Sequence, residues 1–88
     1  MKTDSAKYVK QPNTLRPYRL YDGKTSKPIP HRYYRWHQNV HNGATLMMRW
    51  AKRSETIEVV NIARGKLLAQ YTRNSKGIFI HREPGDHQ

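Results

Sequence analysis

Cationic and aromatic side chains are closely interleaved along residues 16–36 of this chain. They are Arg16, Tyr18, Arg19, Tyr21, Lys24, Lys27, His31, Arg32, Tyr33, Tyr34, Arg35 and Trp36. Lysine and arginine neutralise phosphates and release their counterions, an attraction that weakens steeply with salt. Aromatic rings stack on unpaired bases, and a guanidinium group can stack as well as donate hydrogen bonds. Residues of these types in this arrangement point to a polyanion, above all nucleic acid, as the partner.

The net charge of +11 is concentrated in the first part of the 88-residue chain. Residues 1–53 contain 12 Lys and Arg against Asp4 and Asp22, whereas residues 54–88 contain five against four acidic residues. Such an asymmetry is typical of a face or arm that binds a polyanion. The alternative is that the charge only keeps a small protein in solution, although self-repulsion at this charge costs stability.

Other kinds of chemistry have little support in the residues. Glu55 and Glu58 are expected to be two solvated surface acids rather than a general acid–base pair. His37 and His41 could share a metal on a helix, but no cysteine or acidic ligand accompanies them, so no metal site is predicted. No serine lies in a nucleophile motif, and the glycines match neither a Walker loop nor a dinucleotide fingerprint. We therefore expect no cofactor and no catalytic residue.

One class of enzyme needs no motif and stays open as an alternative. Small toxin-like ribonucleases use Arg, Lys, Tyr and His for phosphate chemistry, often on an antiparallel sheet. Tyr71, Arg73, His81 and Arg82 supply such residue types here. The usual pair of early helices is not evident, however, and the second half of the chain has almost no net charge.

The first forty residues are expected to contain little helix. Residues 1–14 form a flexible basic arm, because they cannot bury enough apolar surface to fold alone. Residues 18–21 predict a short strand, and residues 24–30 predict a basic loop because two prolines remove amide donors. Residues 31–40 favour a strand through their aromatic residues, although their apolar positions also follow helical spacing.

Residues 43–53 predict an amphipathic helix with Asn42 as its N-cap. One arc of this helix is apolar and the opposite arc is cationic. The apolar arc contains Ala44, Leu46, Met47, Met48, Trp50 and Ala51, and the cationic arc contains Arg49, Lys52 and Arg53. Read as helix, turn and helix, residues 31–53 would mimic a helix-turn-helix unit, but such a unit normally needs a third supporting helix.

The second half of the chain predicts three strands, at residues 56–62, 66–72 and 78–81, joined by short turns as an antiparallel meander. The helix needs a partner for its apolar arc, and one face of the meander provides it. The expected fold is therefore α+β, with one amphipathic helix packed on an antiparallel sheet of three to five strands. A single domain covers residues 15–83, and residues 84–88 form a frayed tail. With few aliphatic residues available, we expect Trp36, Trp50 and about half of the tyrosines to pack in the core.

Residues 49–73 resemble small early proteins of T7-like phages. The resemblance rests on an amphipathic helix that ends in Trp-Ala, a strand with Ile-Glu-Val, and a Gly-containing turn into a strand that ends in Tyr. It covers under a third of the chain and transfers no site residue. It implies one alternative function, since small phage proteins often bind and disable a host enzyme. The partner would then be an acidic host protein that handles nucleic acid.

The sequence thus predicts a non-catalytic, largely sequence-nonspecific nucleic-acid-binding protein, with DNA and RNA both open as ligands. The predicted binding residues are Arg16, Arg19, Lys24, Lys27, Arg32, Tyr33, Arg35, Arg49, Lys52 and Arg53. No apolar run approaches the roughly 18–20 residues that span a bilayer, so we expect no membrane partner and a cytoplasmic location.

Overall fold

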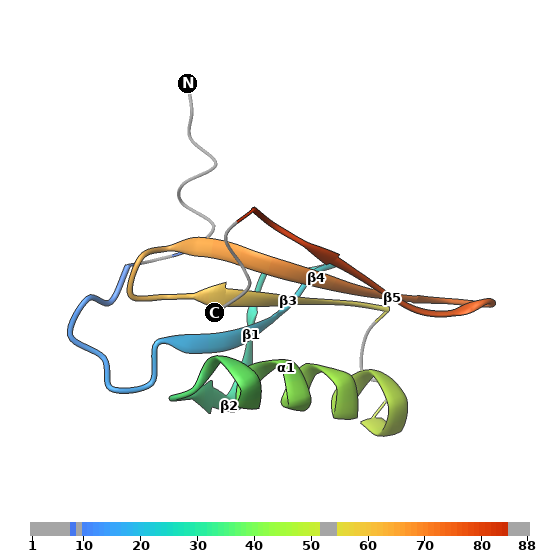
Figure 1. Cartoon of the computed structure of the whole chain (residues 1–88), viewed down its shortest axis with the longest axis horizontal. Helices are drawn as coiled ribbons and strands as arrows, with labels where there is room; N and C mark the ends of the chain where they lie inside the picture. The colour runs from blue at the N-terminus through green and yellow to red at the C-terminus, as the bar shows by residue number, and fades with distance from the viewer. Residues whose placement is uncertain (1–7, 9, 52–54, 85–88) are drawn as a thin grey trace.

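The computed structural model describes residue 8, residues 10–51 and residues 55–84. Within them, one helix packs on one face of a five-stranded antiparallel sheet, which confirms the predicted α+β fold (Figure 1). The strands lie in the order β2-β1-β3-β4-β5. No helix of these residues is long and apolar enough to cross a bilayer. The elements are β1 (Tyr18–Asp22), β2 (Pro28–Tyr34), α1 (His37–Leu46), the π-helical turn η2 (Met47–Ala51), β3 (Thr56–Asn61), β4 (Lys66–Asn74) and β5 (Gly77–Arg82).

The β-branched run of β3 lies at the centre of the sheet. Side chains alternate along a strand, so Ile57 and Val59 face the helix while Val60 faces the other side. β4 and β5 follow as the predicted meander, and β1 pairs with the opposite edge of β3. The main core lies between helix and sheet and contains Leu20, Ile29, Val40, Ala44, Met47, Met48, Ile57, Val59, Ala69 and Tyr71.

A smaller cluster lies on the sheet face away from the helix. It consists of Tyr21, Val60 and Ile62, with Tyr8 and Leu67 packed against them. The Tyr8 ring meets the Tyr21 ring edge-on at a centroid distance of 5.6 Å. Gln11 donates a main-chain hydrogen bond to the carbonyl of Ile62, just after β3. The predicted arm therefore already contacts the sheet region through Tyr8 and Gln11, before the expected domain start at residue 15. Residues 1–7 and 9 of the arm and residues 85–88 of the predicted tail lie outside the described residues.

The helix begins at His37, so the prediction of a start at Gly43 was wrong. Buried positions recur at helical spacing from Val40 onwards, because the apolar stripe that faces the sheet already begins there. Asn42, predicted as the N-cap, is an exposed residue inside the helix, and Trp36 occupies the N-cap position instead. The strand expected over residues 31–40 ends at residue 34.

The loop predicted for residues 24–30 was also wrong at its end, because β2 begins at Pro28. This strand lies at the sheet edge and pairs with β1 alone, and an edge strand tolerates prolines that a central strand does not. The β1–β2 register shifts between Arg19 and Tyr21, opposite the prolines. His31 in the irregular stretch has a φ of +62°, in the left-handed region.

Neither tryptophan packs in the core as predicted. Trp36 is 59% exposed and Trp50 is 77% exposed, and Leu46 also faces outwards. Because the helix starts earlier and η2 is a wider turn, Val40, Ala44, Met47 and Met48 face the sheet instead. Glu58, in contrast to the tryptophans, is more buried than predicted. It was expected to be solvated, but it is only 1% exposed, because β3 is the central strand.

Candidate functional site

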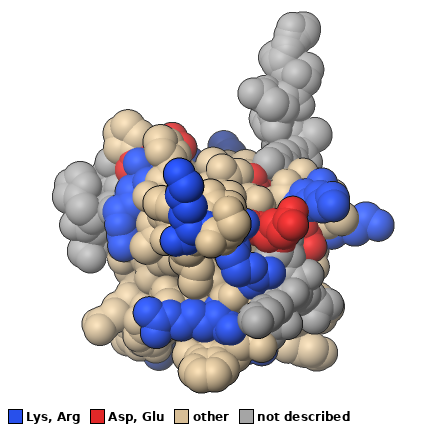
Figure 2. Space-filling model, turned by 90° about the vertical axis from the view of Figure 1, so that its right-hand side faces the viewer, with Lys and Arg blue, Asp and Glu red and all other residues tan. Residues whose placement is uncertain are grey.

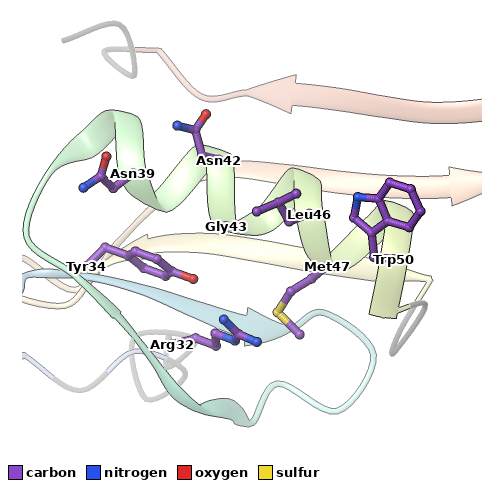
Figure 3. A pocket seen from close by; sticks show the side chains of 8 residues that line it. All are labelled: Arg32, Tyr34, Asn39, Asn42, Gly43, Leu46, Met47 and Trp50. Carbon is purple, nitrogen blue, oxygen red and sulfur yellow. The ribbon is translucent and has the colours of Figure 1, made fainter.

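An open groove of about 470 Å³ runs between β2 and the helix (Figure 3). Arg32 and Tyr34 reach it from β2, and the remaining side chains come from α1 and η2. Its volume lies within the range of about 300–1,000 Å³ found for small-molecule sites. The lining residues are Arg32, Tyr34, Asn39, Asn42, Gly43, Leu46, Met47 and Trp50.

Helical spacing positions the outer wall of this groove. Asn39, Asn42, Leu46 and Trp50 follow one another three or four residues apart, which places them along one side of a helix. The sheet-facing side holds the buried core residues, so this row borders the open side of the helix. The groove wall therefore combines two amides with an aliphatic and an indole side chain.

Gly43 allows β2 to approach the helix closely. A Cβ atom at this position would overlap the Tyr34 hydroxyl group and the ring carbon that carries it. Any larger residue would displace Tyr34 from the groove floor. This close approach explains why a residue of low helix propensity lies within α1.

Arg73 on β4 supports the end of the helix. Its guanidinium Nη1 donates a hydrogen bond to the main-chain carbonyl of Met48 in η2. A π-helical turn shifts the backbone hydrogen bonds to i→i+5, and such turns are frequent at functional sites. Arg73 thus links the sheet to the turn that carries Trp50.

Replacing Arg73 by methionine is expected to lower the free energy of unfolding by about 1.5–3 kcal/mol, because a hydrogen bond from a charged donor is lost. It should also change the near-ultraviolet circular dichroism of the tryptophans, since η2 loses its support. Urea denaturation and the spectrum of the native state measure the two effects. Arg64→Met, in the exposed β3–β4 turn, is the matched control. Equal behaviour of the two variants would contradict this role of Arg73.

The predicted binding residues occupy more than one face. Arg32 lines the groove, whereas Arg19 lies on the sheet face away from the helix, with its guanidinium 3.9 Å from the Tyr33 ring centroid. Arg35 lies over the Trp36 ring at 5.0 Å. The structure therefore brings Arg19 together with Tyr33, but not with Arg32.

The remaining predicted cations are dispersed. Arg16 precedes β1, Lys24 and Lys27 lie in the β1–β2 turn, and Arg49 lies in η2, all of them exposed. Lys52 and Arg53 lie outside the described residues. Figure 2 shows Lys and Arg side chains in several separate places on one face, with fewer acidic side chains among them. The Lys and Arg side chains of the described residues thus do not form one continuous track on that face.

Burial affects one titratable group beside these residues. Burial raises the pKa of the Tyr21 hydroxyl, and the nearby Arg19 guanidinium partly opposes this shift. Tyr21 therefore stays a neutral phenol at ordinary pH. It contributes an aromatic ring to its face and no negative charge.

Sequence reasoning missed a polar network between α1 and the sheet. A hydrogen bond of 2.6 Å joins Nδ1 of the buried His41 to the Tyr71 hydroxyl, and Arg82 Nη1 lies 3.4 Å from Nε2 of the same ring. A guanidinium only donates, so Nε2 accepts and the His41 proton lies on Nδ1, which donates to Tyr71. The His37 ring lies 4.7 Å from His41. In the described residues, no group of three potential metal ligands occurs.

Tyr71→Phe should lower the free energy of unfolding by about 1–3 kcal/mol, because the buried Nδ1–H of His41 loses its acceptor. Urea denaturation measures the change. Tyr33→Phe, at an exposed tyrosine, should have almost no effect. A stability loss of equal size in both variants would contradict this account of the network.

The four residues considered for a ribonuclease divide between the two sheet faces. Tyr71, Arg73 and Arg82 lie on the helix side, where they contact His41 or Met48. His81 alternates to the other side of β5 and lies 3.2 Å from a Glu83 carboxylate oxygen. The ribonuclease alternative stays a prediction, with His81 separated from the other three residues.

Comparisons of the chain with protein families, with curated proteins and with solved structures found no match. The resemblance of residues 49–73 to early proteins of T7-like phages therefore stays a prediction.

Proposed function

We propose that this protein is a non-catalytic, largely sequence-nonspecific nucleic-acid-binding protein that uses the groove between β2 and α1. The observation that carries the proposal is Trp50, a large aromatic side chain that is 77% exposed at the groove, together with the guanidinium of Arg32. An exposed aromatic ring beside a cation suits a base and its phosphate.

Charge supports the same proposal. The chain carries +11, and the described residues that line the groove include one cation and no acidic residue. Dispersed exposed cations raise the rate of encounter with a polyanion without fixing one orientation. This arrangement favours binding with little sequence preference. We propose a cytoplasmic location together with this function, because nucleic acid is present there as a ligand.

Titration of labelled oligonucleotides tests the proposal. Single- and double-stranded oligonucleotides are titrated with the full chain at about 50 and 200 mM salt. Binding through six or more phosphates should weaken by roughly a thousandfold across that range. No binding at the lower salt concentration would overturn the proposal.

The same experiment separates the alternatives. Without oligonucleotide binding, the remaining prediction is an inhibitory protein with an acidic host partner, which a pull-down would identify. RNA incubated with the protein, with and without ribosomes, should stay intact. Cleavage of the RNA would contradict the non-catalytic part of the proposal and favour the ribonuclease.

A further inference from the structure

We infer that the groove between β2 and α1 takes one unpaired nucleotide of a single strand, with its base against Trp50 and its phosphate at Arg32. The inference rests on the proposed function and specifies its ligand. It commits to a single strand over a duplex, and to this groove over the opposite sheet face that carries Arg19 and Tyr33.

Trp50 provides the surface for the base. Its indole lies at the end of the groove on η2, and the exposed Leu46 lies one helical turn before it (Figure 3). Met47 adds an apolar contact from the same helix. A flat apolar ligand gains most from such walls, and every nucleobase offers a flat π-face.

Arg32 provides the complementary charge. It is exposed on the β2 edge and is the one charged side chain among the described residues that line the groove. A guanidinium binds phosphate oxygens through parallel hydrogen bonds. Arg32 on the strand would bind the phosphate of the nucleotide, and Trp50 on the helix would stack on its base.

Asn39 and Asn42 suit the edges of neighbouring bases of the strand, because they lie roughly 12–17 Å before Trp50 along the helix, too far to reach the base on Trp50. Each side-chain amide has two donor hydrogens and one acceptor oxygen, and both are exposed along the groove. Amides can reorient to match different donor and acceptor patterns. They therefore allow hydrogen bonding to any of the bases, in keeping with weak sequence preference.

Base stacking argues against a duplex. The space of about 470 Å³ is large enough for one nucleotide. In a duplex the base faces are covered by stacking, so Trp50 has no ring face to contact. A single strand can turn one base outwards into the groove at little cost.

A pair of hexanucleotides tests the inference. One is a single-stranded hexamer with bases, and the other is an abasic hexamer with the same phosphates. Trp50→Ala should weaken binding of the first by about 5- to 150-fold, which corresponds to about 1–3 kcal/mol of stacking. It should leave binding of the abasic hexamer unchanged. Arg32→Gln should weaken binding of both hexamers by similar factors.

Trp36→Ala is the matched control, because Trp36 is also exposed but does not line the groove. It should change neither affinity. Thermal unfolding of each variant checks that the fold is retained, and Arg32→Gln provides a second test if Trp50→Ala is unstable.

The outcomes separate the inference from the proposed function. If both hexamers bind and Trp50→Ala weakens neither, or weakens both equally, the inference is overturned while nucleic-acid binding stands. A variant with Trp36→Ala that behaves like Trp50→Ala also overturns it. If the unmodified protein binds neither hexamer at low salt, the proposed function fails.

Discussion

Replacing Leu20 by alanine is expected to lower the free energy of unfolding by about 2–5 kcal/mol, the usual cost of removing a buried leucine side chain. Leu20 is fully buried in β1, within the main core between the helix and the sheet. A chain of 88 residues typically has a total stability of about 5–13 kcal/mol. One such cavity therefore removes a large share of it. Urea denaturation followed by circular dichroism measures the change.

Leu15→Ala is the matched control for this prediction. Leu15 is 83% exposed in the segment before β1, so the same chemical change leaves no cavity. Its effect should stay within about 0.5 kcal/mol. A comparable loss in both variants would contradict the assignment of Leu20 to the core.

Removing three exposed cations, Arg32 of the groove together with Arg35 and Arg49 outside its lining, is expected to weaken oligonucleotide binding by about a hundredfold at low salt. The variant combines Arg32→Gln, Arg35→Gln and Arg49→Gln. Three lost charge-assisted contacts of about 1 kcal/mol each give an effect of this size. The dependence of log affinity on log salt should also become shallower by about 2 for a single strand. The circular dichroism spectrum should not change, because the three side chains are exposed.

The control for this variant removes the same charge elsewhere. It combines Arg64→Gln, Lys66→Gln and Lys76→Gln. These three exposed residues lie in or beside the turns that flank β4. The control measures the general effect of lowering the net charge, which should be several times smaller. Equal losses for the two triple variants would mean that binding depends on net charge and not on the groove.

The second half of the fold could be predicted because local signals agree with the tertiary structure. The β-branched residues of β3 and the turn residues on either side of β4 specify strands independently of where the helix begins or packs. The first half could not be predicted in the same way. In the sequence, Gly43 indicates a helix start. The structure shows that a glycine is needed there because the Tyr34 ring lies directly against the helix. In the sequence, Pro28 and Pro30 indicate a loop. The structure places them in β2, which tolerates prolines because it is an edge strand.

The candidate site could be predicted only in part, for a related reason. Arg32 was predicted from charge, whereas Asn39 and Asn42 were missed because the helix was expected to begin after them. Their spacing with Leu46 and Trp50 was the available signal, had the helix been extended back to residue 37. Trp50 was assigned to the core because few aliphatic residues are available to fill it. Its exposure differs from that expectation, and such differences are expected at functional sites.

The most direct measurement is a nuclear magnetic resonance titration of the ¹⁵N-labelled full chain with a single-stranded hexanucleotide at low salt. The account predicts that the indole N–H signal of Trp50 and the side-chain amide signals of Asn39 and Asn42 shift. The indole N–H signal of Trp36 and the main-chain signals of β5 should shift much less. Shifts centred on Arg19 and Tyr33, or no shifts with the hexanucleotide in excess, would contradict the account.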